Sequence, residues 1–189
     1  MANFTAVFDA CVLYPAPLRD LLISVAMTEQ FRAKWTDEIQ REWVRNLLAN
    51  RDDLTEEQLQ RTVDLMNQAI PDCLVENYEE LIDSIELPDP DDRHVLAVAI
   101  MCQADVIVTN NLKDFPQAVM DKYRIDAQSP DVFLSHLFDL SPTAFCKAVR
   151  EMRQRLRDPE HTAEELLNTL YNQGLPMTVN KLKDVMELI

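Results

Sequence analysis

The sequence predicts an α/β fold with a central, mainly parallel sheet, followed by a small all-helical extension. Two observations predict it. Short apolar segments typical of buried strands alternate with amphipathic helical segments over residues 1–140, which is the pattern of a parallel sheet covered by helices. From Ser141 onward the pattern is helical only. We therefore predict an α/β domain at residues 1–140 and a helical extension at residues 141–189.

The first part of the chain supplies one strand and three helices. The apolar run at residues 4–8 is a buried strand that ends at Asp9. Three segments with apolar stripes at helical spacing follow, at residues 16–27, 35–50 and 54–70. Thr36 is placed to cap the second helix, and Thr55 and Gln58 have the spacing of a capping box at the start of the third.

The second part alternates more quickly. Its predicted elements, in order, are a helical piece after Cys73, a short strand at 85–88, a helix at 94–102, a strand at 106–108, a short helix at 115–122, a strand at 123–127 and a helix at 130–140. Three helices form the extension. Their predicted signals are the N-cap pair Ser141 and Pro142, the capping box of Thr162 and Glu165, and Gly174 as a C-terminal stop.

Composition narrows the class of protein. The chain has 189 residues but one glycine, which excludes the glycine-rich loops that bind dinucleotides or nucleoside triphosphates. It has no apolar run of about 18 residues and no signal-peptide pattern, so we expect a cytoplasmic protein without membrane association. Its four cysteines show no CxxC spacing, and we expect them to be reduced thiols.

The net charge of −15 is concentrated in the first part of the chain. Residues 1–140 contain 11 Lys and Arg against 26 Asp and Glu, whereas the extension contains 7 of each sign. So acidic a surface repels phosphate backbones unless cations intervene. It argues against a generic nucleic-acid binder, and it favours cation binding, a basic partner or simple solubility.

Acidic and amide side chains follow two predicted strands, lie on one predicted helix and begin another. Parallel strands end at the same edge of a sheet, so we expect these groups to converge there. They are Asp9, Glu42, Asp92, Asn111 and Asp114. Converging carboxylates repel each other, and a cation relieves that repulsion. Oxygen ligands without His or Cys favour Mg²⁺ or Mn²⁺ over zinc.

Four segments, "VFDACVL", "EIQREW", "DPDDRHVLAVA" and "DVIVTNNLKDF", resemble the signature segments of the PIN-domain ribonucleases. The chain is most similar to the VapC-type toxins of type II toxin–antitoxin modules, in the subgroup with a helical C-terminal extension. The resemblance implies a three-layer α/β/α PIN fold and a metal-dependent endoribonuclease, using Mg²⁺ or Mn²⁺. It also implies an RNA substrate, a cognate antitoxin protein that inhibits the enzyme, and a homodimer.

The resemblance assigns roles residue by residue. Asp9, Glu42 and Asp92 match the family's first three acids, and Asn111 stands where the fourth usually lies. Asn111 adds no charge, so Asp114, one turn later, is the candidate to complete the catalytic set. Asp9, Asp92 and Asp114 would then ligate the metal. Thr109 matches a hydroxyl residue that bonds an acidic ligand, and His94 beside Asp92 is a candidate for a supporting role, as is Asn111.

These assignments have rivals. Glu42 lies between Glu38 and Arg45 on a helix flank, where a glutamate is usually a solvated face residue. Asp89 and Asp91 are typical of a helix start. Trp35 and Trp43 are predicted to be core residues. The loss of one acid also leaves open a catalytically weakened PIN-like scaffold that acts by binding proteins.

The extension contains one cationic cluster. Lys147, Arg150, Arg153, Arg155 and Arg157 fall within eleven positions, and Arg150, Arg153 and Arg157 are spaced to share a helical face. This stripe is a candidate for binding RNA phosphates. The alternative is that it forms salt bridges with the acidic domain.

Overall fold

The computed structural model describes residues 4–157 and 159–189. At its centre is a four-stranded, all-parallel sheet in the order β2-β1-β3-β4. The strands are β1 (Thr5–Phe8), β2 (Arg32–Lys34), β3 (Val106–Val108) and β4 (Asp126–Gln128). Ala6 of β1 is in register with Ala33 on one side and Val106 on the other. The predicted α/β class is confirmed.

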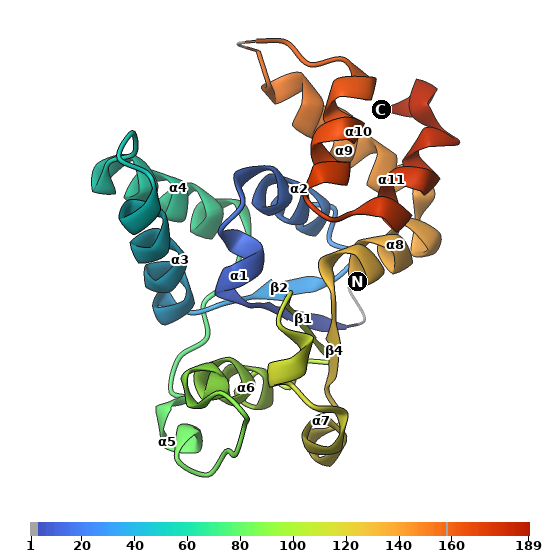
Figure 1. The fold of residues 1–189 in the computed structure, drawn as a ribbon. Coiled ribbons are helices and arrows are strands. Elements are labelled where there is room, and N and C mark those ends of the chain that lie inside the picture. The colour runs from blue at the N-terminus through green and yellow to red at the C-terminus, as the bar shows by residue number, and fades with distance from the viewer. Residues whose placement is uncertain (1–3, 158) are drawn as a thin grey trace.

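Helices cover the sheet in two layers (Figure 1). On one side lie α1 (Ala10–Leu13), α2 (Ala16–Ala26), α3 (Asp37–Asn50) and α4 (Glu56–Ala69). On the other side lie α5 (Glu79–Ile82), α6 (Arg93–Met101) and α7 (Gln117–Tyr123). The result is a three-layer α/β/α arrangement. Each strand leads at its carboxyl end into a loop or helix.

An aromatic cluster joins the sheet to the helices. Phe31 and Phe133 meet edge to face with ring centroids 5.1 Å apart, and Phe8 stacks on Trp35 at 6.2 Å. Trp43 is also completely buried, so both tryptophans are core residues, as predicted. Aromatic pairs in these geometries stabilise a fold by more than their buried area alone. The cluster therefore helps to fix the position of β1, whose end carries Asp9.

Most predicted helix signals are confirmed. The Thr36 side chain accepts a hydrogen bond from the backbone N–H of Ile39 at 3.1 Å. The capping boxes at Thr55 and at Thr162 are both complete. Gly174 adopts φ of 79°, the left-handed conformation that ends a helix at little cost for glycine. Ser141 precedes α9, but its side chain makes no capping hydrogen bond.

Two local predictions are wrong. Residues 85–88 form no strand, because buried Ile85 and Leu87 alternate with exposed neighbours without pairing to another strand. The helical piece after Cys73 is reduced to the single turn of α5. No strand was predicted at β2, a short edge strand in which Arg32 is exposed and Ala33 is buried.

The extension is helical, as predicted, and is docked on the α/β layers. After α8 (Pro130–Leu140) come α9 (Pro142–Arg155), α10 (Ala163–Asn172) and α11 (Pro176–Lys183). Helix α9 packs on α2, and Arg155 donates to Ser24 Oγ at 2.6 Å. The buried Asp131 of α8 accepts the backbone N–H groups of Met177 and Thr178 at 2.9 and 2.8 Å. Because α8 packs against α11 in this way, the division at residue 140 stays a prediction.

Two further expectations concern the whole chain. All four cysteines are free thiols. Within residues 4–157 and 159–189, none of the helices has the length and apolar character needed to cross a bilayer.

Candidate active site

Asp9 is the most buried acid of the predicted site. It follows β1 directly, the residue is 3% exposed, and it occupies the N-cap position of α1. Thr109, which follows β3, donates its hydroxyl to Asp9 Oδ2 at 2.6 Å. The backbone N–H of Asn111 donates in turn to Thr109 Oγ1 at 3.0 Å, which fixes the direction in which the hydroxyl donates. The two neighbouring parallel strands therefore bring Asp9 and Thr109 together, and the predicted role of Thr109 fits this contact.

Cys11 is a second donor to Asp9 that sequence reasoning missed. Its thiol donates to Asp9 Oδ2 at 3.1 Å, and the backbone N–H of Asn110 donates to its sulfur at 3.2 Å. Burial, followed by the charge of Asp9, raises the pKa of the Cys11 thiol to about 12. The thiol therefore stays protonated and keeps its donor role. Its position two residues after a strand-ending acid was the one available signal.

Asp92 lies where the other predicted acids converge. It is half-buried at the junction of a 3₁₀ turn (Pro90–Asp92) and α6. Its pKa is raised to about 7, first by burial and then by the negative charges of Asp9, Asp89, Asp114 and Glu42. A charge shifts a pKa strongly only at short range. The four predicted catalytic acids, Asp9, Glu42, Asp92 and Asp114, therefore lie in one region of the structure.

Asp89 has the capping role expected of it and also contributes to this region. Its side chain accepts the backbone N–H of Asp91 at 2.9 Å. Its charge nevertheless adds to the repulsion on Asp92. The acidic concentration before α6 therefore serves both the helix start and the site.

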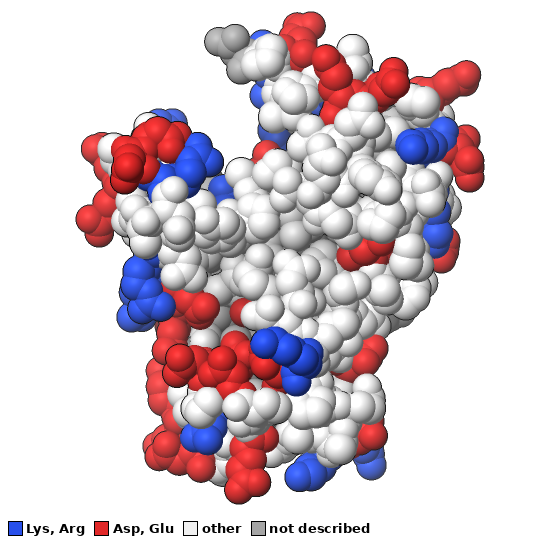
Figure 2. Space-filling view, in the orientation of Figure 1, with Lys and Arg blue, Asp and Glu red and all other residues white. Residues whose placement is uncertain are grey.

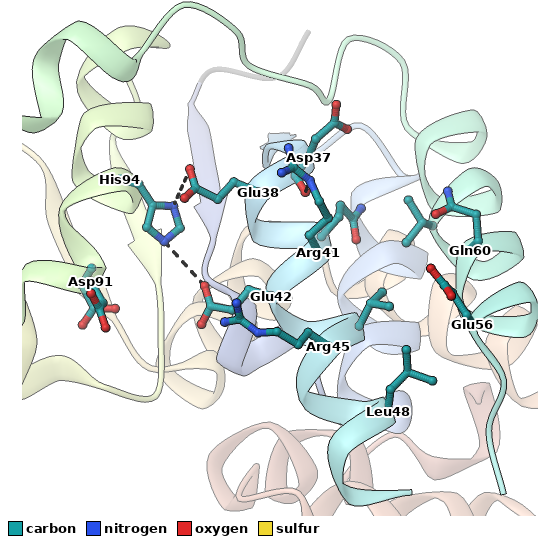
Figure 3. Close-up of a pocket in the computed structure, with 14 residues that line it drawn as sticks. Asp37, Glu38, Arg41, Glu42, Arg45, Leu48, Glu56, Gln60, Asp91 and His94 are labelled. Atoms are coloured by element: carbon teal, nitrogen blue, oxygen red, sulfur yellow. Dashed lines mark hydrogen bonds and ion pairs between the residues drawn. The ribbon is translucent and has the colours of Figure 1, made fainter. Parts of the chain in front are cut away.

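Glu42 contacts His94, which is almost completely buried. His94 Nε2 lies 3.5 Å from Glu42 Oε2, and its Nδ1 lies 3.8 Å from Glu38 Oε2 (Figure 3). Burial lowers the pKa of His94. The interaction with Glu42 and the charges of Glu38, Glu42 and Asp9 together raise this pKa by more than burial lowers it, so the net shift is upward. Glu42 is thus more than a solvated face residue, since its carboxylate meets a buried imidazole.

Asp114 and Asn111 flank the end of β3 differently. Asp114 closes a 3₁₀ turn (Leu112–Asp114), is half-buried, and adds its charge to the field at Asp92. Its backbone N–H donates to the carbonyl of Asn111 at 2.9 Å. Asn111 is exposed and carries no charge. The negative charge at this end of the site therefore comes from Asp114.

A groove of about 1010 Å³ passes along α3 beside these residues. Glu42, Asp92 and His94 line one part of it, and Arg41 and Arg45 of α3 line another. The surface view shows acidic side chains gathered beside α6 and the adjacent end of α3 (Figure 2). Arg41 and Arg45 are exposed and one helical turn apart, and the sequence did not indicate a binding role for either of them. The groove therefore combines an acidic end with two cations.

The donor chemistry of this region fits a hard divalent cation. The converging groups are carboxylates, and the raised pKa of Asp92 reports repulsion that a bound cation would relieve. Across the described residues, however, no three His, Cys, Asp or Glu side chains are arranged closely enough to hold a metal ion. The structure thus supplies convergent charge, without a ready set of ligands.

The cationic stripe differs from its prediction. Helix α9 ends at Arg155, so Arg157 lies beyond it and does not share a helical face with Arg150 and Arg153. Arg153 donates to the carbonyls of His161 and Ile189 at 3.1 and 3.4 Å, which ties the extension together.

Of the other cations of the stripe, Arg155 donates to Ser24 Oγ of α2 at 2.6 Å, which is a hydrogen bond to an uncharged residue. Lys147 pairs with Glu151 at 3.8 Å. Arg150 and Arg157 are exposed. In the part of the chain that the structure describes, no ion pair joins the stripe to the acidic domain, so that alternative is not supported.

Comparisons with known proteins agree with this geometry. A family model described as a PIN domain matches residues 5–113, and a second, described as the VapC50 C-terminal domain, matches residues 130–184. Over 82 residues the chain is 43% identical to a Mycobacterium tuberculosis protein named "Putative ribonuclease VapC50". That alignment covers 43% of this chain and 48% of the relative, so the chain spans about half the length of the curated relative it matches. No solved structure matches the chain.

Proposed function

Because the chain belongs to the PIN-domain family, we propose that it is a metal-dependent endoribonuclease that hydrolyses RNA phosphodiester bonds. The observation that carries the proposal is the crowding at Asp92, where burial and four neighbouring carboxylates raise the pKa to about 7. Such crowding is costly unless a cation binds, and it is typical of functional sites. The name of the M. tuberculosis relative supports a ribonuclease.

Asp9, Asp92 and Asp114 are the residues that would hold Mg²⁺ or Mn²⁺. A divalent cation, when bound, makes water more acidic and neutralises negative charge that develops on the phosphate oxygens. Thr109 and Cys11 both donate to Oδ2 of Asp9, at 2.6 and 3.1 Å, and so hold its carboxylate in one orientation. Fixed side chains of this kind lower the cost of assembling the site.

Glu42 stands apart from the metal-holding set. It is half-buried on α3, beside His94, and lines the same groove as Asp92. We assign it the task of orienting the attacking water and accepting its proton. Arg41 and Arg45 in that groove offer charges for the phosphates on either side of the scissile bond. None of these steps needs a Ser or His nucleophile.

We further propose that the enzyme is the toxin of a toxin–antitoxin pair, acts in the cytoplasm and forms a homodimer. The match of residues 130–184 to the VapC50 C-terminal domain supports this assignment. The acidic excess of residues 1–140 suits a basic partner segment, such as part of an antitoxin. The basic residues Lys147, Arg150 and Arg157 of the extension remain candidates for RNA contacts, with Arg153 occupied by the carbonyls of the extension.

Asn111 motivates the second candidate, a PIN-like scaffold with weakened catalysis that acts through protein binding. The residue carries no charge where the resembled family usually has an acid. The scaffold predicts Mg²⁺ or Mn²⁺ binding without cleavage of RNA, whereas the ribonuclease predicts both.

The two candidates are separated with purified protein. Total RNA is incubated with the parent and with Asp9→Asn, in Mn²⁺, in Mg²⁺ and in excess chelator, and new ends are mapped. Asp83→Asn, an exposed position at the end of α5, is the matched control. The ribonuclease predicts cuts that need metal, vanish in Asp9→Asn and persist in Asp83→Asn. Metal binding by the parent without any cuts would favour the scaffold.

A further inference from the structure

His94 lies between two carboxylates of α3. Glu38 and Glu42 are one helical turn apart and point to the same side of the helix. The His94 side chain is 9% exposed and faces both carboxylates, with Nδ1 3.8 Å from Glu38 Oε2 and Nε2 3.5 Å from Glu42 Oε2 (Figure 3). Among the described residues, Nδ1 has no hydrogen-bond partner. A buried polar nitrogen in this situation is held chiefly by the charge that it faces.

Glu38 also accepts a hydrogen bond from Tyr78. The Tyr78 hydroxyl donates to Glu38 Oε2 at 2.8 Å, the same oxygen that faces His94. Tyr78 is 5% exposed and immediately precedes α5, so its ring is immobilised by packing. Burial, then the hydrogen bond to Glu38, raises the pKa of Tyr78 to about 12, which keeps the hydroxyl a donor. Glu38 is exposed, and this hydrogen bond gives its long side chain a defined position.

The contacts form one connected row that ends at the proposed site. The row runs from Tyr78 through Glu38 and His94 to Glu42, and it links the turn before α5, helix α3 and the first turn of α6. His94 lies two residues after Asp92, so its contact with Glu42 also holds Glu42 close to the segment that carries Asp92. A glutamate has several rotatable bonds, and holding it in one geometry requires such support.

We propose that Tyr78 and Glu38 are positioning residues that act through His94 to hold the Glu42 carboxylate at the site. The assignment rests on the proposed function for its catalytic consequence, because Glu42 belongs to that site. A purely structural role for Tyr78, as a side chain that packs α5 against its neighbours, predicts a different result. If Tyr78 had only that structural role, removing its hydroxyl would lower the thermal stability and leave the kcat of the folded enzyme unchanged.

The catalytic arm of the test uses Tyr78→Phe and Glu38→Gln, which keep the ring and the shape of the side chain. Removing an outer partner of a site residue typically costs about tenfold in activity. We expect kcat to fall by about that factor in each variant, with KM for RNA unchanged. Because the two residues act in series, the kcat of the double variant should be no lower than that of the less active single variant. Tyr171→Phe, at a 54% exposed position of α10, is the control.

A second arm needs neither metal nor turnover. The chain has three histidines, so the ring nitrogens of His94 can be assigned by NMR through a His94→Gln variant. At one fixed pH we expect the ¹⁵N shifts of His94 to move in Tyr78→Phe and in Glu38→Gln and to stay in place in Tyr171→Phe. Unmoved shifts in both variants would overturn the proposal.

The two arms separate failure of this inference from failure of the proposed function. A parent enzyme that cleaves RNA, with kcat unchanged in both variants, retains the function and overturns the positioning role. A parent enzyme that does not cleave RNA removes the proposed function, and moved His94 shifts then still support the row of contacts. Loss of kcat that is only additive in the double variant contradicts action through a single row.

Discussion

Replacing Asp92 by asparagine is predicted to make the metal-free protein more stable. Burial, followed by the charges of Asp9, Asp89, Asp114 and Glu42, raises the pKa of Asp92 from its ordinary value of 3.8 to about 7 in the folded protein. The folded state holds the proton on Asp92 more tightly than the unfolded state does. The contribution of Asp92 to the free energy of unfolding is therefore complete below pH 4 and is lost as the pH rises through about 7. Asparagine cannot ionise, so the variant keeps that stability at pH 8.

The size of the effect follows from the same numbers. A difference of about three pH units corresponds to an upper limit of about 4 kcal/mol. Asp92 is only half-buried, and solvent screening reduces this to about 1–2 kcal/mol. For a chain of this length each kcal/mol moves the melting temperature by about 2–4 °C. The variant should therefore melt about 2–8 °C above the parent at pH 8, and close to the parent at pH 4.

The assay is thermal unfolding by circular dichroism in excess chelator at pH 4 and pH 8, with Asp83→Asn as control. Added Mn²⁺ should stabilise the parent more than Asp92→Asn, because the variant has lost a ligand. A variant that melts below the parent at pH 8, or one whose gain is the same at both pH values, would refute the account of charge crowding at this site.

Three further changes test single parts of the site. Asn111→Asp should tighten Mn²⁺ binding in calorimetry, because it adds a charge next to a site that now relies on Asp114. Thr109→Val removes the hydroxyl that bonds Asp9 at 2.6 Å, so kcat should fall by about tenfold with little change in KM. Removing both groove cations, as Arg41→Gln with Arg45→Gln, should raise KM for RNA and weaken its dependence on salt concentration while kcat is retained.

Matched positions away from the groove serve as controls for these changes. Asn50→Asp adds the same charge at the far end of α3, and Thr143→Val removes an exposed hydroxyl from α9. Arg61→Gln removes an exposed cation from α4. An Arg61 variant that raises KM as much as the groove variant would point to a general charge effect. Unchanged Mn²⁺ affinity in Asn111→Asp would place the fourth acid elsewhere.

Elements with a local signal were predictable from the sequence. Asp9 and Asn111 each follow a buried apolar run, and parallel strands end at one edge of a sheet, so the pattern placed them near each other. The contact of Thr109 with Asp9 was expected from the family resemblance and not from the pattern. The start of α3 followed from Thr36, whose side chain caps it. Local capping chemistry and burial thus located the elements that carry Asp9, Glu42 and Asp92.

Contacts between distant segments could not be predicted in the same way. Tyr78 and Glu38 are 40 positions apart, and no periodicity relates the hydroxyl to the carboxylate that it bonds. Cys11 was treated as an ordinary thiol, since only the fold brings its sulfur to Asp9 and Asn110. The end of α9 before Arg157 was missed because the cations were grouped by helical spacing alone. The chain leaves the helix at the half-buried Leu156, and Pro159, three residues later, was the available stop signal.

The most direct test of the central claim is induced expression of the parent beside Asp92→Asn, with Asp83→Asn as control, followed by mapping of new ends in total cellular RNA. A metal-site ribonuclease predicts growth arrest and discrete cuts for the parent and the control, and neither for Asp92→Asn. The same cuts in the Asp92 variant would contradict the assigned site, and arrest without cuts in any strain would contradict the proposed chemistry.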